Sequence, residues 1–401
     1  MDVAARPPGD YAPACGVEAV ERLTRAAGAL EGARVLHVST AGGGGGAADL
    51  LSAVLPLASG AGVEVEWRVL FGGPELTDAA ASLHAGLQGA ESATAEAGWR
   101  AYLAACEQAA ADIDGDWDAV VLHDPGTLGL APALRVAPVW RCHVDASAPD
   151  ASAWERARPL VEACAATVFA DASFAPPGID APAAIAPGID PLGARNAESA
   201  PLVAGRALRR LGLDLDQPLT SQLMRLDRWG DPHSAIEAFA LVRQELPTAQ
   251  LVIACQLGPD GAAWPALKEI SDYAGDQEGL HLLTSHAELG NLELRALNQL
   301  SRVALRLSLH EGFGLAASEA MWRGTPVVGG TGGGTPLQMR DGIDGYLADG
   351  AEQVAARIVE LIRDPGLATE MSRAGRERVR ERYLITRVLA DELELLAGLS
   401  D

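Results

Sequence analysis

The chain has 401 residues, with 54 aspartates and glutamates against 31 lysines and arginines, and its formal net charge is -23. This length is too great for one ordinary core and predicts two domains. The negative charge repels nucleic acid and anionic membrane surfaces at long range, so we expect neither as a partner.

The N-terminal residues and the cysteines bear on the compartment. Residues 1–8 lack the apolar core of a signal peptide, and no apolar run is long enough to cross a bilayer. The five cysteines are scattered, without a CxxC pair or an even disulfide set. We therefore expect a cytoplasmic protein that makes no membrane contact and whose cysteines are core residues.

The first half of the chain alternates apolar, partly β-branched runs with Ala- and Leu-rich stretches that are typical of helices. The runs lie at 33–40, 63–70, 119–123 and 138–144. This alternation predicts a doubly wound parallel sheet. A region rich in Pro, Gly and Ala from about 170 to 205 lacks periodicity and predicts the connection between two domains.

A second alternation follows this connection. Strands are predicted near 218–225, 250–254, 280–283, 303–309 and 326–329, with helices such as 234–246 and 315–323 between them. A charged helix with apolar residues at helical spacing is predicted over 375–399. The fold class is therefore α/β with two Rossmann-like halves, in which ligands lie at the C-terminal ends of the strands.

A glycine-rich loop at 41–47 follows the first strand and precedes a predicted helix. Its glycines, Gly43 and Gly44 among them, permit a ligand to approach the backbone closely. Dinucleotide binding would need an acidic residue at the end of the second strand, where Leu70 is followed by Phe71. A flexible turn is the alternative to a ligand loop.

Four aspartates in the run 112–118 raise the question of a metal site. An EF-hand loop would need Gly where Trp117 stands and Glu where His123 stands. We therefore predict an acidic, solvated turn before the third strand, and no bound metal.

Polar residues cluster where predicted strands end. His123 and Asp124 end the third strand, and Arg141, His143 and Asp145 end the fourth. The C-terminal ends of parallel strands share one edge of a sheet, so these residues are expected at the edge of a ligand cleft. A lone histidine in such a place is more often structural than catalytic, so the residues alone leave the role of His143 open.

Arg225 ends the first strand of the second half. A guanidinium is always ionised and offers a fork of donors, which suits a leaving diphosphate on which charge develops. The alternative is a surface ion pair with Asp227.

The segment His310–Ala320 places Glu311 and Glu319 eight residues apart around a Gly-Phe-Gly turn, between a strand and a helix. A helix start leaves backbone N–H groups unpaired and suits a phosphate or diphosphate. Carboxylates do not hold phosphate, so we assign the two glutamates to the hydroxyls of an attached sugar. The segment therefore predicts a nucleotide-sugar site.

Several segments together resemble trehalose synthases, which are retaining glycosyltransferases of the GT-B fold that join nucleotide-activated glucose to free glucose. The segments are Val139–Asp145, Ile185–Leu192, Arg225–Trp229, Thr335–Gln338 and the Glu311-to-Glu319 element with its Gly-Phe-Gly turn. They follow one another in the family's order, from about Tyr11 to the C-terminal helix. The resemblance implies two Rossmann-like domains facing across a cleft, with the last helix packed back on the first domain.

The resemblance also implies domain limits, ligands and roles. The limits are 1–195 for the acceptor domain, 206–380 for the nucleotide-sugar domain and 381–401 for the returning helix. The catalytic residues are Glu311, His143 and Arg225; the donor-binding residues are Arg225, Arg228, Glu311, Phe313, Gly314, Leu315 and Glu319; the acceptor-binding residues are Gly43, Gly44, His123, Asp124, Arg141 and Asp145. The implied partners are a nucleoside diphosphate sugar and a small acceptor, with no cofactor and no metal; a homodimer is left open.

Some positions depart from the family's pattern. Gly230 stands where the family carries a Lys beside the diphosphate. The charged hydrogen bond that such a Lys would make is worth roughly 1.5–3 kcal/mol. Arg228 and Arg306 are the candidates to replace that cation. His310 replaces a family Arg, and Gly126 replaces a Gln, which removes a donor and an acceptor and points to a changed sugar or acceptor.

Three functions follow for comparison. The first is a retaining transfer of glucose or a related hexose to a sugar or sugar-like hydroxyl. The second is a phosphorylase of the same fold, because Gly230 leaves less positive charge and a single phosphate needs less. The third is a catalytically silent binder, against which the retained Arg225, Glu311 and Glu319 argue.

Overall fold

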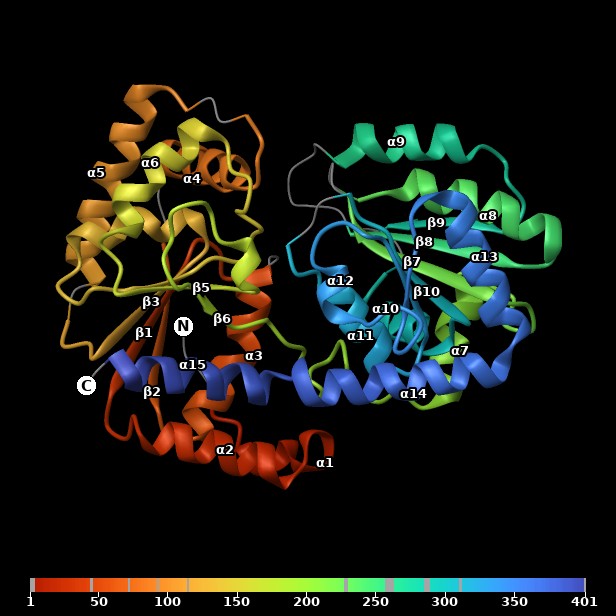
Figure 1. Ribbon diagram of the computed structural model, residues 1–401, viewed down its shortest axis with the longest axis horizontal. Helices are drawn as coiled ribbons and strands as arrows, with labels where there is room; N and C mark the ends of the chain where they lie inside the picture. Colours follow the sequence, from red (N-terminus) through yellow and green to blue (C-terminus); the bar gives the residue numbers. More distant parts are fainter. Residues whose placement is uncertain are drawn as a thin grey trace. The chain divides into compact units, whose positions relative to one another are not determined.

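The computed structural model describes residues 4–43, 46–70, 73–91, 94–113, 115–226, 230–256, 263–284, 289–309 and 312–399 (Figure 1). Its contacts divide the chain into two compact units, which we call the N-terminal unit (1–188 with 384–401) and the C-terminal unit (189–383). The sequence-based limits were set at 195, 206 and 380. No helix among the described residues is long and apolar enough to span a bilayer.

The N-terminal unit contains a six-stranded, all-parallel sheet in the order β2-β1-β3-β4-β5-β6. The strands are β1 (Arg34–Ser39), β2 (Glu64–Val69), β3 (Ala119–His123), β4 (Val139–Arg141), β5 (Ala166–Phe169) and β6 (Ala183–Ala184). The helices are η1 (Pro8–Tyr11), α1 (Ala12–Cys15), α2 (Val17–Gly28), α3 (Gly46–Gly60), α4 (Pro74–Leu87), α5 (Glu96–Ile113), η2 (Pro125–Ala133), α6 (Ala151–Val161) and η3 (Ala172–Phe174). The alternation of strands and helices confirms the predicted α/β class.

Helix α15 (Ile385–Leu399) completes the N-terminal unit from the far end of the chain. Its residues Ile385, Leu389, Leu393 and Leu396 recur at helical spacing and join one buried cluster with β1, β3, α2 and α3. The helix packs directly against α2 and α3. The last helix therefore covers one face of this sheet.

The C-terminal unit contains a second all-parallel sheet in the order β12-β11-β10-β7-β8-β9. The strands are β7 (Leu219–Arg225), β8 (Gln250–Gln256), β9 (Leu280–Thr284), β10 (Val303–Arg306), β11 (Val327–Gly329) and β12 (Tyr346–Leu347). The helices are α7 (Pro201–Arg210), α8 (Pro232–Glu245), α9 (Ala263–Ala274), α10 (Asn291–Leu300), α11 (Ala316–Trp322), α12 (Thr335–Gln338), α13 (Gly350–Arg363) and α14 (Pro365–Arg382).

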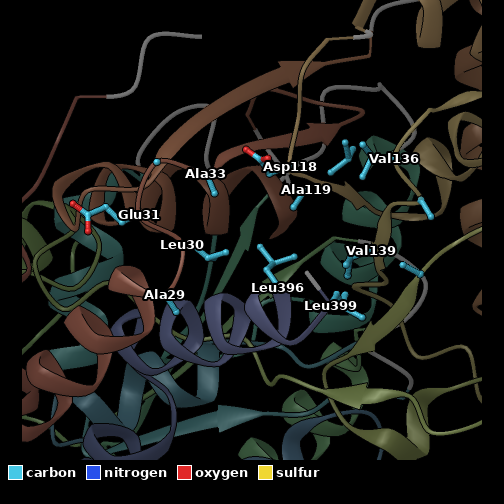
Figure 2. Close-up of a pocket in the computed structure, with 14 residues that line it drawn as sticks. Ala29, Leu30, Glu31, Ala33, Asp118, Ala119, Val136, Val139, Leu396 and Leu399 are labelled. Atoms are coloured by element: carbon cyan, nitrogen blue, oxygen red, sulfur yellow. The ribbon is translucent and has the colours of Figure 1, made fainter. Parts of the chain in front are cut away.

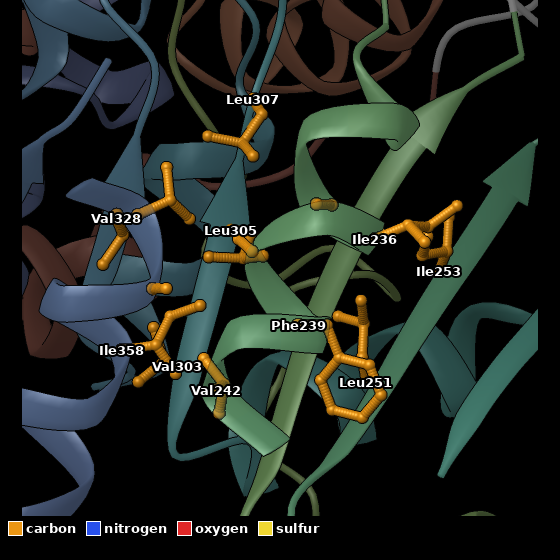
Figure 3. Packing of buried hydrophobic residues seen from close by; sticks show 14 of the residues in the cluster. Ile236, Phe239, Val242, Leu251, Ile253, Val303, Leu305, Leu307, Val328 and Ile358 are labelled. Carbon is orange, nitrogen blue, oxygen red and sulfur yellow. The ribbon is translucent and has the colours of Figure 1, made fainter. Parts of the chain in front are cut away.

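The core of the C-terminal unit follows from side-chain alternation on its central strands. Val303 and Leu305 of β10 point to the same face because they are two residues apart, and there they meet Phe239 and Val242 of α8 and Ile358 of α13 (Figure 3). Helix α8 begins after Asp231, whose side chain accepts the Ser234 N–H and caps it. Burial on this face fixes the strands β7 and β10, whose C-terminal ends carry Arg225 and Arg306.

The single helix expected over 375–399 is wrong, because the structure has two helices there. Helix α14 ends before Tyr383, which has φ −128° and ψ 28°, and α15 begins at Ile385. The Tyr383 hydroxyl donates to Leu337 O at 2.7 Å, and its carbonyl accepts the Ile189 N–H at 2.8 Å. These contacts hold Tyr383 out of the helix, which apolar spacing alone does not reveal.

Candidate active site

A row of polar side chains crosses the sheet of the N-terminal unit near the C-terminal ends of its strands. Alternate residues of a strand share a face, so His37 lies on the face of Val35 in β1, and His123 on the face of Val121 in β3. His123 is the register partner of Arg141 in β4. Val35 and Val121 belong to the cluster covered by α15, so this polar row lies on the same side.

Three histidines of this region are joined in series. Nδ1 of His37 lies 3.1 Å from Nε2 of His123, and Nδ1 of His123 lies 3.0 Å from Nε2 of His143. His37 and His123 are buried, whereas His143 is partly exposed. Sequence analysis singled out His123 and His143 but did not predict that His37 connects to them.

The environment keeps these imidazoles neutral. Desolvation is the largest cause of the pKa shift of each ring. It lowers the pKa of His37 and lowers the pKa of His123 further. Desolvation and the charge of Arg141 together lower the pKa of His143 to about 3. A neutral imidazole carries one N–H and one bare nitrogen. His143 can therefore donate with one nitrogen and accept with the other, but it does not supply a positive charge at neutral pH.

Arg141 was expected to bind the acceptor, and the structure gives its side chain another partner. Its Nη1 forms an ion pair with Glu392 of α15, and both side chains are almost completely buried. A buried ion pair loses its solvation and is kept only with good geometry. The structure therefore places Arg141 where it ties the returning helix to β4.

Asp124 has an unusual backbone conformation directly after β3. Its φ of 67° is in the left-handed region, which costs a non-glycine residue roughly 1–3 kcal/mol. The Asp124 N–H donates to Arg141 O, and its carbonyl accepts from the Trp140 indole. Desolvation raises the pKa of its carboxyl to about 7. Strain and a perturbed acid at a strand end are common at functional sites.

The other predicted acceptor residues differ in how the structure uses them. Asp145 accepts the Ser147 N–H at 3.0 Å. Gly43 is exposed, and a Cβ built there would meet no described atom within 4 Å. Gly44 lies outside the described residues. Gly126, which was noted as a departure from the family's Gln and not as an acceptor residue, is tightly packed, since a Cβ there would be 2.7 Å from Thr40 Cγ2 and 2.9 Å from Ala80 Cβ.

In the C-terminal unit, Arg225 is exposed at the C-terminal end of β7, where its guanidinium is accessible to a ligand. Gly230 pairs with Ser308 in an isolated bridge beside β10. A Cβ at Gly230 would lie 2.2 Å from Met224 Cε, so a flexible thioether side chain occupies the start of any side chain at that position. Arg228 lies outside the described residues.

Arg306 was a candidate for the missing cation. The structure buries it at the end of β10, where it donates to Asn298 Oδ1 at 2.8 Å and to Leu305 O. Its guanidinium is therefore engaged within the C-terminal unit.

The loop before α11 is held by one buried amide. The side chain of Gln338 donates to Phe313 O at 2.6 Å and to Gly314 O at 2.9 Å. Its Oε1 accepts the Ser318 N–H and hydroxyl at 3.1 and 2.7 Å. Gln338 thereby fixes the turn and takes one N–H from the first turn of α11 that a phosphate could otherwise have used.

The residues of this loop have distinct environments. Glu311 lies outside the described residues. Phe313 is buried against the Tyr383 ring, with centroids 5.4 Å apart. Gly314 has φ 67°, which glycine adopts without strain. Leu315 is partly buried and precedes α11. Gly312 and Gly314 are partly exposed, so part of the backbone of this turn is accessible.

A second glycine-rich segment packs against the loop through its backbone. A Cβ at Gly334 would lie 2.5 Å from Phe313 Cα and 2.6 Å from Gly312 O. A Cβ at Gly332 would lie 2.6 Å from Leu309 O. Only glycine allows the two segments to approach this closely, so the segment after β11 supports the loop 312–315.

Glu319 lies in the first turn of α11 and is buried. Its Oε1 is 3.3 Å from the Arg195 Nε, a pair within the C-terminal unit. A sugar hydroxyl that bound Glu319 would share the carboxylate with this guanidinium.

Two other features lie away from the strand C-termini. Arg34 lies over the Trp117 ring and its backbone N–H donates to Asp118, so the acidic turn is partly packed. Among the residues that the structure describes, no group of three or more His, Cys, Asp or Glu side chains could hold a metal ion.

A cavity of about 660 Å³ is lined by residues such as Ala33, Asp118 and Leu396 (Figure 2). It lies where β1 and β3 begin, at the opposite edge from the histidines.

Sequence comparison identifies both units. Residues 37–176 match the family "Trehalose synthase, N-terminal domain", and residues 206–378 match "Glycosyl transferases group 1". The trehalose synthase of Rubrobacter xylanophilus is 35% identical, with 97% of this chain and 96% of the relative aligned. The trehalose synthase of Pyrococcus horikoshii is 31% identical over the same shares.

Solved structures agree on the fold. The N-terminal domain of Candida albicans trehalose-6-phosphate phosphatase superposes with a TM-score of 0.71 at 14% identity, covering 92% of this chain and 97% of that one. Anabaena HepE, solved in complex with UDP and glucose, gives 0.68 at 16% identity, with coverages of 91% and 99%. The identity at full length, the two matched families and the two parallel-sheet units together show that this chain is a GT-B glycosyltransferase belonging to the trehalose synthase family.

Proposed function

We propose that the protein transfers a hexose, glucose in the first instance, from a nucleoside diphosphate to a sugar or sugar-like hydroxyl with retention of the anomeric configuration. The observation that carries the proposal is the loop 312–315, which Gln338 holds through the carbonyls of Phe313 and Gly314. A fixed turn with accessible backbone suits a ligand whose phosphates and hydroxyls need preset partners. The relatives named trehalose synthase suggest the product class.

Arg225 stabilises the leaving group in this proposal. The bond between the anomeric carbon and the diphosphate oxygen breaks, and negative charge develops on that oxygen. The exposed guanidinium at the end of β7 offers a permanent charge and several donors to it. Stabilisation that grows as the bond breaks raises the rate of the chemical step.

The acceptor hydroxyl completes the reaction on the same face of the sugar. Its oxygen forms the new bond to the anomeric carbon, and its proton passes to the leaving phosphate oxygen, so a nucleoside diphosphate and an α-linked glycoside result. His143 and Glu311 hold hydroxyls of the transferred ring, and the N-terminal unit provides the acceptor side through Asp124, whereas the buried His123 contacts His143. The proposal needs no cofactor and no metal.

In the test, the protein is incubated with a panel of nucleoside diphosphate glucoses, with and without glucose and related acceptors. Nucleotide release and the anomeric NMR signals of the sugars are measured. Release that depends on the acceptor and yields an α-linked glycoside supports the proposal. Measurable nucleotide binding without release from any donor would overturn it and indicate a silent binder.

Gly230 favours a second candidate, a phosphorylase of the same fold. Gly230 carries no cation, and Met224 Cε lies where a side chain at this position would begin. A single phosphate needs less positive charge than a diphosphate. Formation of glucose 1-phosphate from trehalose and inorganic phosphate, without nucleotide, would support this candidate over the first.

A further inference from the structure

The histidines His37, His123 and His143 form one continuous chain of ring nitrogens, and their protons can be counted. Three neutral imidazoles carry three N–H protons. Two of these protons occupy the two N···N contacts of 3.1 and 3.0 Å. The third must therefore reside at one end of the chain, on Nε2 of His37 or on Nδ1 of His143.

This count couples the two ends. If Nε2 of His37 carries the third proton, all three rings are Nε2–H tautomers, and Nδ1 of His143 is bare. If it does not, all three rings are Nδ1–H tautomers, and Nδ1 of His143 is a donor. A ligand can reach this series of histidines only at His143, since the rings of His37 and His123 are buried.

The charges around the chain favour one of these directions. The carboxylate of Glu392 on α15 acts on His37, and a negative charge favours an N–H at that end. His143 is influenced by the positive charge of Arg141 on β4 and by His84 on α4, and a positive charge favours a bare nitrogen there. Arg141 also acts on His37, but there the charge of its partner Glu392 opposes it.

We propose that His37 is a positioning residue which holds the third proton on Nε2 and so keeps Nδ1 of His143 bare, as an acceptor for a sugar hydroxyl. The contribution to turnover rests on the proposed function, because it requires that His143 contacts a sugar. The tautomers themselves do not depend on any substrate. In this arrangement Glu392 of the returning helix determines, through His37 and His123, what His143 offers to a ligand.

The first test is 15N NMR of histidine ring nitrogens in the full-length protein without ligand, with the rings assigned from single substitutions. The expected result is the Nε2–H tautomer for His37, His123 and His143. Nδ1–H tautomers, or different tautomers within the chain, would overturn the proposal.

The second test replaces the far end of the chain. In His37→Leu, Nε2 of His123 loses its acceptor in a buried site, so His123 is expected to carry its proton on Nδ1 and to donate to His143. His143 then becomes an Nδ1–H tautomer. His37→Asn keeps an acceptor oxygen near the former Nδ1 and is expected to preserve the Nε2–H form. An unchanged His143 tautomer in His37→Leu would contradict the coupling.

Turnover separates positioning from packing. His37→Leu should lower kcat/KM about tenfold or more, since His143 presents a donor where the sugar hydroxyl needs an acceptor, and His37→Asn should restore most of the activity. Val35→Ala, on the same strand and face, is the control for lost packing. An equal loss in Val35→Ala and His37→Leu would show a purely structural role. If the wild-type protein shows the expected tautomers but turns over no donor, the proposed function fails and the tautomer assignment stands.

Discussion

In the N-terminal unit, His143 is held by a series of titratable rings beside a buried ion pair, whereas in the C-terminal unit the loop 312–315 is held by the neutral amide of Gln338. The rings and the ion pair can change protonation or lose a charge, while an amide keeps the same donors and acceptors at every pH. Changes of pH and charge substitutions should therefore act on the first region, whereas only loss of geometry should disturb the second.

The ion pair should give the largest effect on stability. Arg141→Met leaves Glu392 buried without its partner and should lower the free energy of unfolding of the N-terminal unit by about 3–5 kcal/mol. Hydrogen exchange of amides in α15 and β4 measures this locally. The double variant Arg141→Met/Glu392→Leu removes both charges and should recover most of the loss; no recovery would mean that packing, not the unpaired charge, dominates.

Arg225 tests the donor side without affecting the fold. Arg225→Met should lower kcat/KM by about 10²–10³-fold, because the developing charge on the leaving group loses its cation. The residue is exposed, so the thermal unfolding midpoint should change little. Arg225→Lys is the matched variant, and it should retain part of the activity as a single point charge. Wild-type activity in Arg225→Met would remove this residue from the mechanism.

Gln338 tests the neutral region. Gln338→Leu leaves Phe313 O, Gly314 O and the Ser318 N–H without their partner and should cost at least about 2 kcal/mol of stability in the C-terminal unit. Hydrogen exchange in α11 and the KM for the donor are the measurements. The loss of stability should be the same at pH 5.5 and pH 7.5. A strong pH dependence of this loss would contradict the difference between the two regions.

Gly334→Ala addresses the same loop from the segment after β11. Its Cβ would approach the Phe313 backbone to 2.5 Å, so the backbone must shift and donor turnover should fall. Gly28→Ala, in α2, is the matched control, since a Cβ there meets no described atom within 4 Å and no activity change is expected. Equal activities of the two variants would show that the close approach is not required.

Acidification should destabilise the N-terminal unit gradually over several pH units. Folding lowers the pKa of His37, His123 and His143 below the ordinary value of 6.5, so the unfolded chain binds more protons as pH falls below 6.5, and stability falls. Each uncompensated proton contributes about 1.4 kcal/mol per pH unit. For His143 the loss continues until about pH 3.

Asp124 acts in the opposite direction and provides the control. Its pKa is raised from 3.8 to about 7, so its contribution falls as pH rises through this range and partly offsets the histidines. Asp124→Asn should therefore steepen the acid-induced loss of hydrogen-exchange protection in β3. An unchanged slope would show that this carboxyl does not titrate between the two values.

Much of the architecture could be predicted from local patterns. Apolar runs followed by helical stretches gave two parallel sheets, and the end of a strand sufficed to select Arg225 and His123. The three short strands β5, β6 and β12 and the break at Tyr383 were not predicted. Their residues carry too little periodicity, and contacts from distant segments determine where these elements begin and end.

The sequence by itself determined the fold class and the positions of most strand ends, because buried apolar residues recur at a spacing typical of each kind of element. It also determined the family, because the family's motifs follow one another in a fixed order. Only the tertiary structure decided that His37 continues the histidine chain, that Arg141 meets Glu392 from 251 residues away, and that Gln338 turns inward to the loop. Such pairs depend on strand register and helix packing. No spacing along the chain encodes which polar groups will share a buried site.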